Sequence, residues 1–190
     1  MTTKERLAAA ARGILLAEGA DAVNMRRVAK DAGLSTMATY RHYPNRETLL
    51  REVADACSTE LAKDWGRRSE ITDPLERLFA LQEDLLDFAL GAPHLYTFLM
   101  TDRREDARRF PGAYRDGASP TYGLVVIAVE EAMRAGLLRE GDPLEVTLAF
   151  TAQAQGLVQL YLGGRIGLPE PEFRALCARS LGRVLDGIKA

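Results

Sequence analysis

The chain has 190 residues, of which 47% are hydrophobic and 27% charged, and its formal net charge is −2. These proportions are ordinary for a folded globular protein and exclude a mainly disordered chain. The charge is uneven, because the first 50 residues carry eight basic and five acidic side chains, whereas the other 140 carry 17 and 22. A basic first segment is typical of a part that contacts a polyanion.

The cysteines and the hydropathy pattern indicate which bonds, bound groups and cellular location to expect. Cys57 and Cys177 are 120 positions apart with no ligand-type residue beside either, so we expect two buried thiols and no disulfide, metal site or cofactor. The first apolar run, Leu7–Ala17, is interrupted by Arg12 and is amphipathic, unlike a signal peptide. No apolar stretch approaches the ~20 residues of a membrane span. We therefore expect a cytoplasmic protein with no membrane contact.

Apolar residues recur at helical spacing along almost the whole chain, and alternating β-branched runs are missing. We therefore predict an all-α fold of nine or ten helices. Side chains that accept hydrogen bonds from backbone N–H groups, followed by apolar periodicity, predict where helices begin. In the first half of the chain, the expected helices cover residues 3–17, 24–33, 35–43, 45 to about 68, 73–90 and 95–100, with N-caps at Asn24, Ser35, Asn45 and Asp73.

The second half begins with a charged stretch, residues 101–118, that contains Pro111, Gly112 and Gly117. We predict a surface connection with one helical turn here. Its charged run, Arg103–Arg109, is expected to be a solvated loop rather than a second segment that contacts a polyanion. The remaining predicted helices cover residues 119–135, 142–163 with Asp142 as N-cap, and a last helix after the loop 165–169.

The segment from Asn24 to Leu50 joins two short helices through a tight turn. Small or β-branched residues at Val28, Ala29 and Ala32 let a second helix pack closely against the first. Gly33 permits the left-handed backbone conformation that such a turn needs. Two short helices joined in this way form a helix-turn-helix, and the second of them enters the major groove of DNA.

Side chains around this turn suit DNA recognition. Asn24, Arg26 and Arg27 lie where helix N–H groups already favour phosphate, and one of the two arginines is expected to face solvent instead. The exposed face of the second helix is expected to show Thr36, Met37, Thr39 and Tyr40. The residues expected to meet base edges and thymine methyl groups are Thr36, Met37, Ala38 and Thr39, and Tyr40 and His42 offer hydrogen-bond donors. The predicted DNA-binding set is Asn24, Arg26, Arg27, Ser35, Thr36, Met37, Ala38, Thr39, Tyr40, His42 and Arg46.

This segment closely resembles the tetracycline-repressor (TetR-type) family of bacterial regulators. The family pattern appears here as Val28-Ala29, Ala32-Gly33-Leu34-Ser35, Tyr40-Arg41-His42-Tyr43-Pro44 and Arg46-Glu47-Thr48-Leu49. Two positions depart from it: Thr39 replaces an aliphatic residue, and Arg46 replaces the commoner lysine, with a fork that can grip phosphate. A weaker likeness links residues 153–158 to the Trp-His-Gly-type segment of one subgroup, although the tryptophan and histidine are absent.

The resemblance implies a homodimeric repressor on a palindromic operator, released when a small-molecule effector binds its helical body. It divides the chain into a DNA-binding domain, residues 1–50, and an effector-binding and dimerisation domain, residues 51–190. In this family the last two helices of each subunit usually form the dimer interface. The nearly all-apolar helix Leu144–Leu162 fits a dimer surface and a central core helix equally well.

An effector pocket would mix apolar walls with a polar anchor, but aromatic and methionine residues at helical spacing also simply fill cores. The main rival is a regulator of the same fold that has no small-molecule effector and answers to a protein partner or to its own abundance. An enzyme is disfavoured, because catalytic motifs, phosphate-binding glycine loops and metal-spaced clusters are missing. The candidate pocket residues are Phe88, Tyr96, Phe98, Met100, Tyr122, Phe150 and Gln153.

Overall fold

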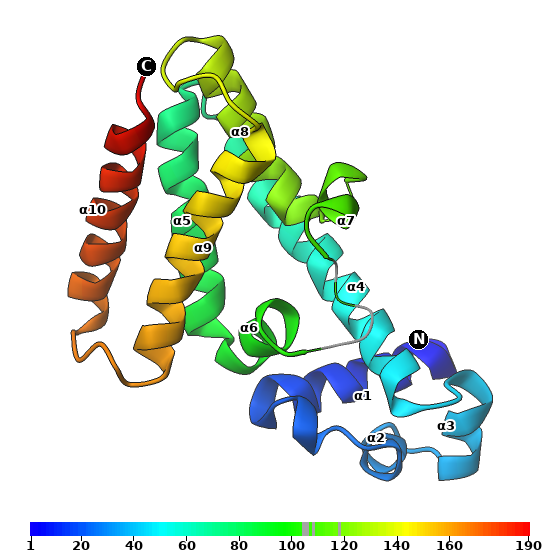
Figure 1. The fold of residues 1–190 in the computed structure, drawn as a ribbon. Helices are drawn as coiled ribbons and strands as arrows, with labels where there is room; N and C mark the ends of the chain where they lie inside the picture. Colours follow the sequence, from blue (N-terminus) through cyan, green and yellow to red (C-terminus); the bar gives the residue numbers. More distant parts are fainter. Residues whose placement is uncertain (104–106, 108, 118) are drawn as a thin grey trace. The chain divides into compact units, whose positions relative to one another are not determined.

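The computed structural model describes residues 1–103, 107, 109–117 and 119–190, which form ten α-helices and two 3₁₀ helices (Figure 1). In this described part of the chain no strand forms, only one isolated bridge between Leu138 and Lys189. The predicted all-α fold is therefore confirmed. The chain divides into two compact units, residues 1–60 with 91–107 and residues 61–90 with 108–190.

The first unit contains the helix-turn-helix. Thr2 begins its first helix with a capping box shared with Glu5, and Asn24 and Ser35 accept hydrogen bonds from the backbone N–H groups of Arg27 and Ala38, as caps do. Its elements are α1 (Thr3–Glu18), η1 (Ala20–Ala22), α2 (Met25–Asp31), α3 (Thr36–His42), the part of α4 (Arg46–Trp65) up to residue 60, and α6 (Pro93–Met100).

Helix α1 is the centre of this unit. Its stripe of Leu7, Ala11, Ile14 and Leu15 is buried, and α1 contacts both α2 and α6. Helix α6 also contacts η1, so this short apolar helix belongs with the helix-turn-helix although it follows α5 in the chain. The sequence did not indicate this association.

The turn between α2 and α3 is closed by backbone and side-chain hydrogen bonds. The N–H groups of Leu34 and Gly33 donate to the carbonyls of Ala29 and Lys30, at 2.8 and 3.0 Å, which is a Schellman motif. Gly33 has φ +65°, in the left-handed region. The guanidinium of Arg6, from α1, donates to the carbonyl of Ala32 and so ties the end of α2 to α1.

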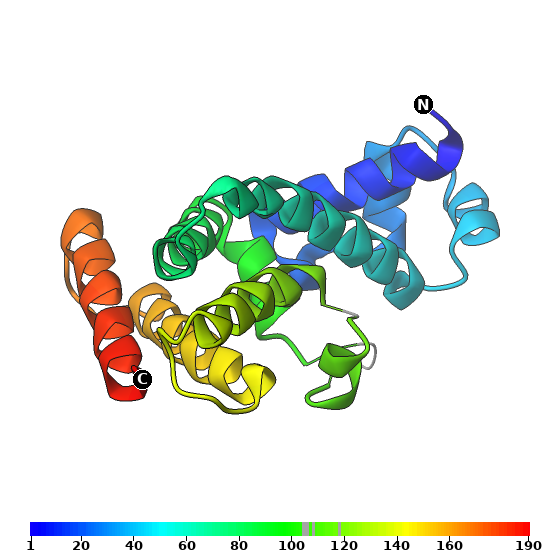
Figure 2. The same cartoon turned by 90° about the horizontal axis from the view of Figure 1, so that it is seen from above.

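The second unit is a helical body. Figures 1 and 2 show α9 and α10 side by side, in agreement with their contacts, and α9 also contacts α8. Asp73 and Asp142 cap α5 and α9 as expected. Its elements are the end of α4, η2 (Gly66–Glu70), α5 (Pro74–Gly91), α7 (Gly112–Arg115), α8 (Pro120–Arg134), α9 (Pro143–Leu162) and α10 (Glu170–Ile188).

A hydrophobic cluster joins four helices of this body, and we call it the core cluster. Ion pairs support it from outside: Arg174 of α10 reaches Glu83 and Asp87 of α5 at 2.9 and 2.8 Å. Buried Arg77 donates to Glu131 of α8 at 2.7 Å and to the carbonyl of Ile71. The core cluster consists of Leu78, Ala128, Val129, Ala132, Leu138, Phe150, Leu181 and Leu185.

The predicted connection across residues 101–118 is described only in part. Residues 104–106, 108 and 118 lie outside the described residues. The prediction of a solvated charged loop therefore falls largely outside the part of the chain that the structure describes. Helix α7 supplies the predicted single turn.

The turn at Gly33 provides a stability test with an internal control. A methyl group at this position would adopt an unfavourable left-handed conformation and come within 3.1 Å of the Arg6 guanidinium. We expect Gly33→Ala to lower the free energy of unfolding by about 1–2 kcal/mol. Gly13→Ala, in the open middle of α1, should raise it by roughly 0.5–1 kcal/mol. Urea unfolding of both variants measures this, and a shift of the same sign in both contradicts the turn geometry.

Candidate nucleic-acid interface

The rotation of α3 about its own axis decides which of its side chains face solvent. Thr39 is fully buried and its hydroxyl donates to the carbonyl of Ser35, whereas Met37 and Tyr40 are 70% and 49% exposed. The prediction that Thr39 lies on the exposed face was therefore wrong. With only two turns in α3, the pattern did not separate Thr39 from its neighbours, and its methyl group occupies the aliphatic position of the family pattern.

The other predicted contacts on α3 surround Met37 and Tyr40. Ser35 and His42 are exposed, and Thr36 and Ala38 are half-buried. Arg41, which the prediction left out, is also exposed on this helix. The exposed face of α3 thus mixes hydroxyl, thioether, imidazole and guanidinium groups, which can meet both base edges and phosphates.

The two arginines at the start of α2 are in different environments. Arg26 is exposed, whereas Arg27 makes a two-pronged ion pair with Glu18 and lies 3.9 Å from Asp31. The hydrogen bond from Arg27 lowers the pKa of the Glu18 carboxyl, so this pair stays charged at neutral pH. Of the two, Arg26 is therefore the one that is free to meet phosphate, and Asn24 is exposed beside it.

Arg46, predicted to contact phosphate, is engaged with backbone carbonyls in this structure. Its Nε donates to the carbonyl of Val23 at 2.7 Å and its Nη2 to that of Ala20 at 2.6 Å. These carbonyls belong to η1 and its end, so Arg46 fixes the segment before α2 onto the start of α4. A guanidinium engaged with two carbonyls does not point its fork at phosphate, and we assign Arg46 a positioning role.

A second positioning cluster, which the sequence did not reveal, lies at the end of α3. The hydroxyl of buried Tyr43 donates to Glu52 of α4 at 2.8 Å, and Lys4 of α1 approaches the same carboxylate at 2.6 Å. Burial would raise the pKa of Glu52, but the hydrogen bonds from Lys4 and Tyr43 outweigh burial and lower it. The negative charge of Glu52 thus connects the end of α3 to α1 and α4.

The candidate effector residues divide between the two units. Tyr96, Phe98 and Met100 lie on α6, in the first unit, and the first two are buried there. The other four belong to the second unit: Phe88 packs edge-to-face on Trp65, Tyr122 donates to the carbonyl of Leu144, Phe150 is in the core cluster, and the carboxamide of Gln153 is buried without a hydrogen-bond partner. Their common role as a pocket stays a prediction.

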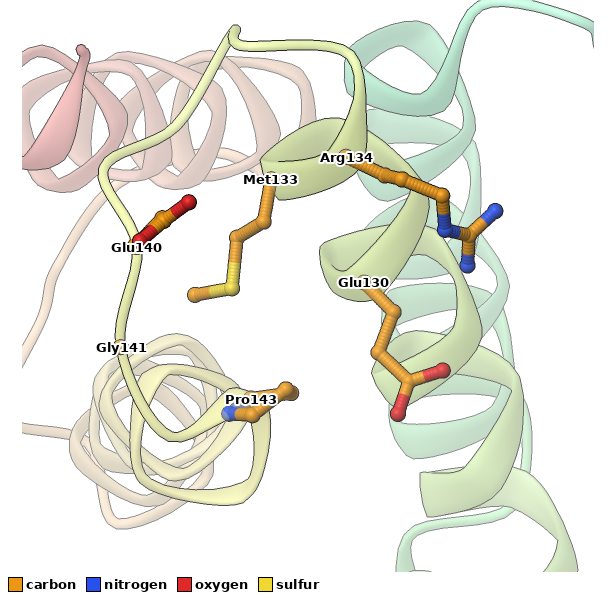
Figure 3. A pocket seen from close by; sticks show the side chains of 6 residues that line it. All are labelled: Glu130, Met133, Arg134, Glu140, Gly141 and Pro143. Carbon is orange, nitrogen blue, oxygen red and sulfur yellow. The ribbon is translucent and has the colours of Figure 1, made fainter.

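An open groove lies where the end of α8 meets the loop that leads to α9 (Figure 3). Glu130, Met133 and Arg134 line it from α8, and Glu140, Gly141 and Pro143 from the other side. None of these side chains is a buried polar group that lacks a partner. Across the described ranges, no group of three or more His, Cys, Asp or Glu residues could hold a metal ion, and no helix is both long and apolar enough to cross a membrane.

The fold and the exposed face of α3 define a helix-turn-helix DNA-binding protein with an attached helical body. Comparison with protein families agrees: residues 7–53 match the family described as "Bacterial regulatory proteins, tetR family", and residues 78–184 match "Tetracyclin repressor-like, C-terminal domain". The chain belongs to the tetracycline-repressor (TetR) family, and it is a DNA-binding transcriptional regulator. The likeness of residues 153–158 to a Trp-His-Gly-type segment stays a prediction.

Known proteins match between 82% and 100% of this chain. The nucleoid occlusion factor SlmA of Vibrio vulnificus is 28% identical over 162 residues, covering 82% of this chain and 79% of that protein. A solved structure from Rhodococcus sp. RHA1 has a TM-score of 0.82 and 24% identity and covers 100% of this chain and 97% of that one. FadR from Bacillus subtilis, solved with stearoyl-CoA, has a TM-score of 0.73 and 15% identity, with 97% and 98% coverage.

Arg46 at the start of α4 and Arg26 in α2 provide a paired test. We expect Arg46→Gln to lower the unfolding free energy by about 1–2 kcal/mol, since two carbonyls lose their donors. The dependence of DNA affinity on salt should be unchanged. Arg26→Gln should leave stability within about 0.5 kcal/mol and lower the salt slope by about one per subunit. Urea unfolding and DNA titrations at several salt concentrations measure both, and the reverse result would return Arg46 to the phosphate contacts.

Proposed function

We propose that this chain is a homodimeric repressor that binds a palindromic operator through α3 and is released when a small molecule binds its second unit. It acts in the cytoplasm as a binding protein and not as an enzyme. The single observation that carries the DNA-binding part is the burial of Thr39, which turns Met37 and Tyr40 outward on a capped, rigidly supported helix.

The DNA-binding part of the proposal assigns two kinds of contact. Met37 and Tyr40, together with Thr36 and Ala38 beside them, read base edges in the major groove. Asn24, Arg26 and Ser35, at the starts of α2 and α3, and His42 at the end of α3 hold phosphates. Because two such helices must reach successive major grooves about 34–36 Å apart, recognition needs two copies of the chain.

The exposed side of α9 supports the dimer. Five of its exposed residues recur at helical spacing along one side of the helix and are apolar or small. Small residues at the centre of the stripe allow a second helix to approach closely, and the leucines at its ends, 39% and 47% exposed, are then covered. The stripe consists of Leu148, Ala149, Ala152, Gly156 and Leu160.

Two observations bear on the effector. The likeness to FadR, which was solved with stearoyl-CoA, supports a small-molecule ligand, and so do the unpartnered polar side chains inside the second unit. The similarity to SlmA, a nucleoid occlusion factor, supports the alternative of a DNA-binding protein of this family that has no such effector. We favour the ligand-responsive repressor, because the unpartnered polar side chains are observed in this chain, whereas the alternative depends on its similarity to another protein.

Tyr40 tests the DNA contact. Since half of its side chain is exposed, Tyr40→Ala should change the unfolding free energy by no more than about 0.5 kcal/mol. Operator affinity should fall at least tenfold, measured by fluorescence anisotropy on a duplex selected from random DNA. Leu16→Ala, which removes an exposed apolar side chain from α1, is the control and should bind normally. Normal binding by a folded Tyr40→Ala protein contradicts the assigned face.

The stripe on α9 tests the dimer. A buried, unpaired carboxylate is strongly unfavourable, so Leu160→Glu should convert the dimer into a folded monomer and weaken operator binding. Leu137→Glu, at an apolar residue that is 37% exposed outside α9, should stay dimeric. Sedimentation velocity gives the oligomeric state and circular dichroism the fold. A Leu160→Glu protein that remains a dimer contradicts this interface.

A further inference from the structure

Two glutamines with buried carboxamides, one on α5 and one on α9, each come one helical turn after a phenylalanine that is part of the core cluster or packed on it. The core cluster and the side chains packed on it use the first halves of α5 and α9, ending at Phe79 and Phe150, so both helices pass through it in the same direction (Figure 1). Three residues further along, on the next turn, come Gln82 on α5 and Gln153 on α9. We call this level the carboxamide layer.

The position of α10 agrees with this layer. Helix α10 uses its second half in the core cluster and therefore runs the opposite way, so the residue one turn before Leu181 is Cys177. Cys177 is fully buried. The ion pair between Arg174 and Glu83, at 2.9 Å, joins α10 to α5 beside the two residues Cys177 and Gln82.

The carboxamides of this layer lack hydrogen-bond partners. Gln82 is 6% exposed, and the amide nitrogen and oxygen of both Gln82 and Gln153 are buried without a partner. The hydroxyl of fully buried Thr147, on the turn of α9 before Phe150, is in the same condition. A buried carboxamide that makes no hydrogen bond destabilises the folded chain, and native proteins retain few such groups without a functional reason.

We propose that the carboxamide layer is the polar part of the effector site and that it selects an uncharged ligand with an apolar body and hydrogen-bonding groups such as amide, hydroxyl or carbonyl. This inference rests on the proposed ligand-responsive function and names the chemistry of its ligand. Gln82 and Gln153 each offer a donor and an acceptor, so one ligand group can both accept from and donate to a single side chain.

The charges of the body favour an uncharged ligand. Among the described residues of the second unit, the one buried cation is Arg77, and its guanidinium is engaged by Glu131 and by the carbonyl of Ile71. Burial raises the pKa of the Cys177 thiol to about 11, so that side chain is neutral as well. A carboxylate or phosphate placed in this layer would lose its hydration without gaining a free cation.

The first test needs no ligand. Methionine has nearly the shape of glutamine without its polar atoms, so Gln82→Met and Gln153→Met should each raise the Tm of the free protein by about 2–4 °C. Gln155→Met is the control, because Gln155 is half-buried two residues further along α9 and its amide is not among the buried unpartnered groups; its Tm should stay unchanged. A Tm that falls or stays the same in both layer variants overturns the proposal.

The second test measures charge selection with probes of matched shape. Phenylacetamide, hexanamide and decanamide are compared with phenylacetate, hexanoate and decanoate, by calorimetry and by release of operator DNA. At least one amide should bind the wild type tenfold more tightly than its carboxylate, and Gln82→Met should lose this binding while keeping operator affinity. Equal binding of both series, or of neither, overturns the ligand class. A wild-type protein that fails to bind operator when no probe is present would instead contradict the proposed function.

Discussion

A helix of seven residues is too short to be stable in water by itself, so α3 exists only because its neighbours hold it. The buried side chains of α2 and the buried Thr39 of α3 set how close the two helices come and how α3 is rotated. That rotation decides which side chains face solvent, and Met37 and Tyr40 are the large ones among them. The candidate interface is therefore a consequence of packing on the opposite side of the same short helix.

Charged side chains from α1 and α4 complete this support. Arg6 holds the end of α2, Arg46 holds the segment before α2, and Glu52 holds the end of α3 through Tyr43. The contacts of Arg6 and Arg46 join residues 26 and 23 positions apart, and both satisfy carbonyls at a helix end or in a turn that would otherwise lack partners. The basic residues of the first 50 positions are thus divided between holding the fold and remaining exposed for a polyanion.

Local signals in the sequence were sufficient for the helices. Capping side chains such as Asn24, Asp73 and Asp142 placed helix starts within a residue or two, because a cap acts on its own backbone. Contacts between distant segments were not predictable in this way. Nothing local shows that α6 packs on α1, or that Arg46 reaches carbonyls rather than phosphate, because a long side chain can serve either role.

Gln82 was missed for a related reason. Gln82 precedes the charged residues Glu83 and Asp84, so the sequence indicates an exposed polar stretch, and only the structure shows that its carboxamide is buried without a partner. Gln153 is among the predicted pocket residues, but it lies 71 positions after Gln82, and its relation to Gln82 depends on two helices that run in the same direction. The chemistry of the body thus follows from topology, whereas the chemistry of α3 follows from a short motif.

The central claim is that the face of α3 carrying Met37 lies against the bases of DNA. Site-specific photo-crosslinking tests it most directly, with a photoreactive phenylalanine analogue at Met37 and, as a comparison, at exposed Glu172 of α10. The account predicts that position 37 crosslinks to the bases of a selected operator duplex, in a manner abolished by excess unlabelled operator, and that position 172 does not. Absence of a crosslink from position 37 in a dimer that is bound to the duplex would contradict it.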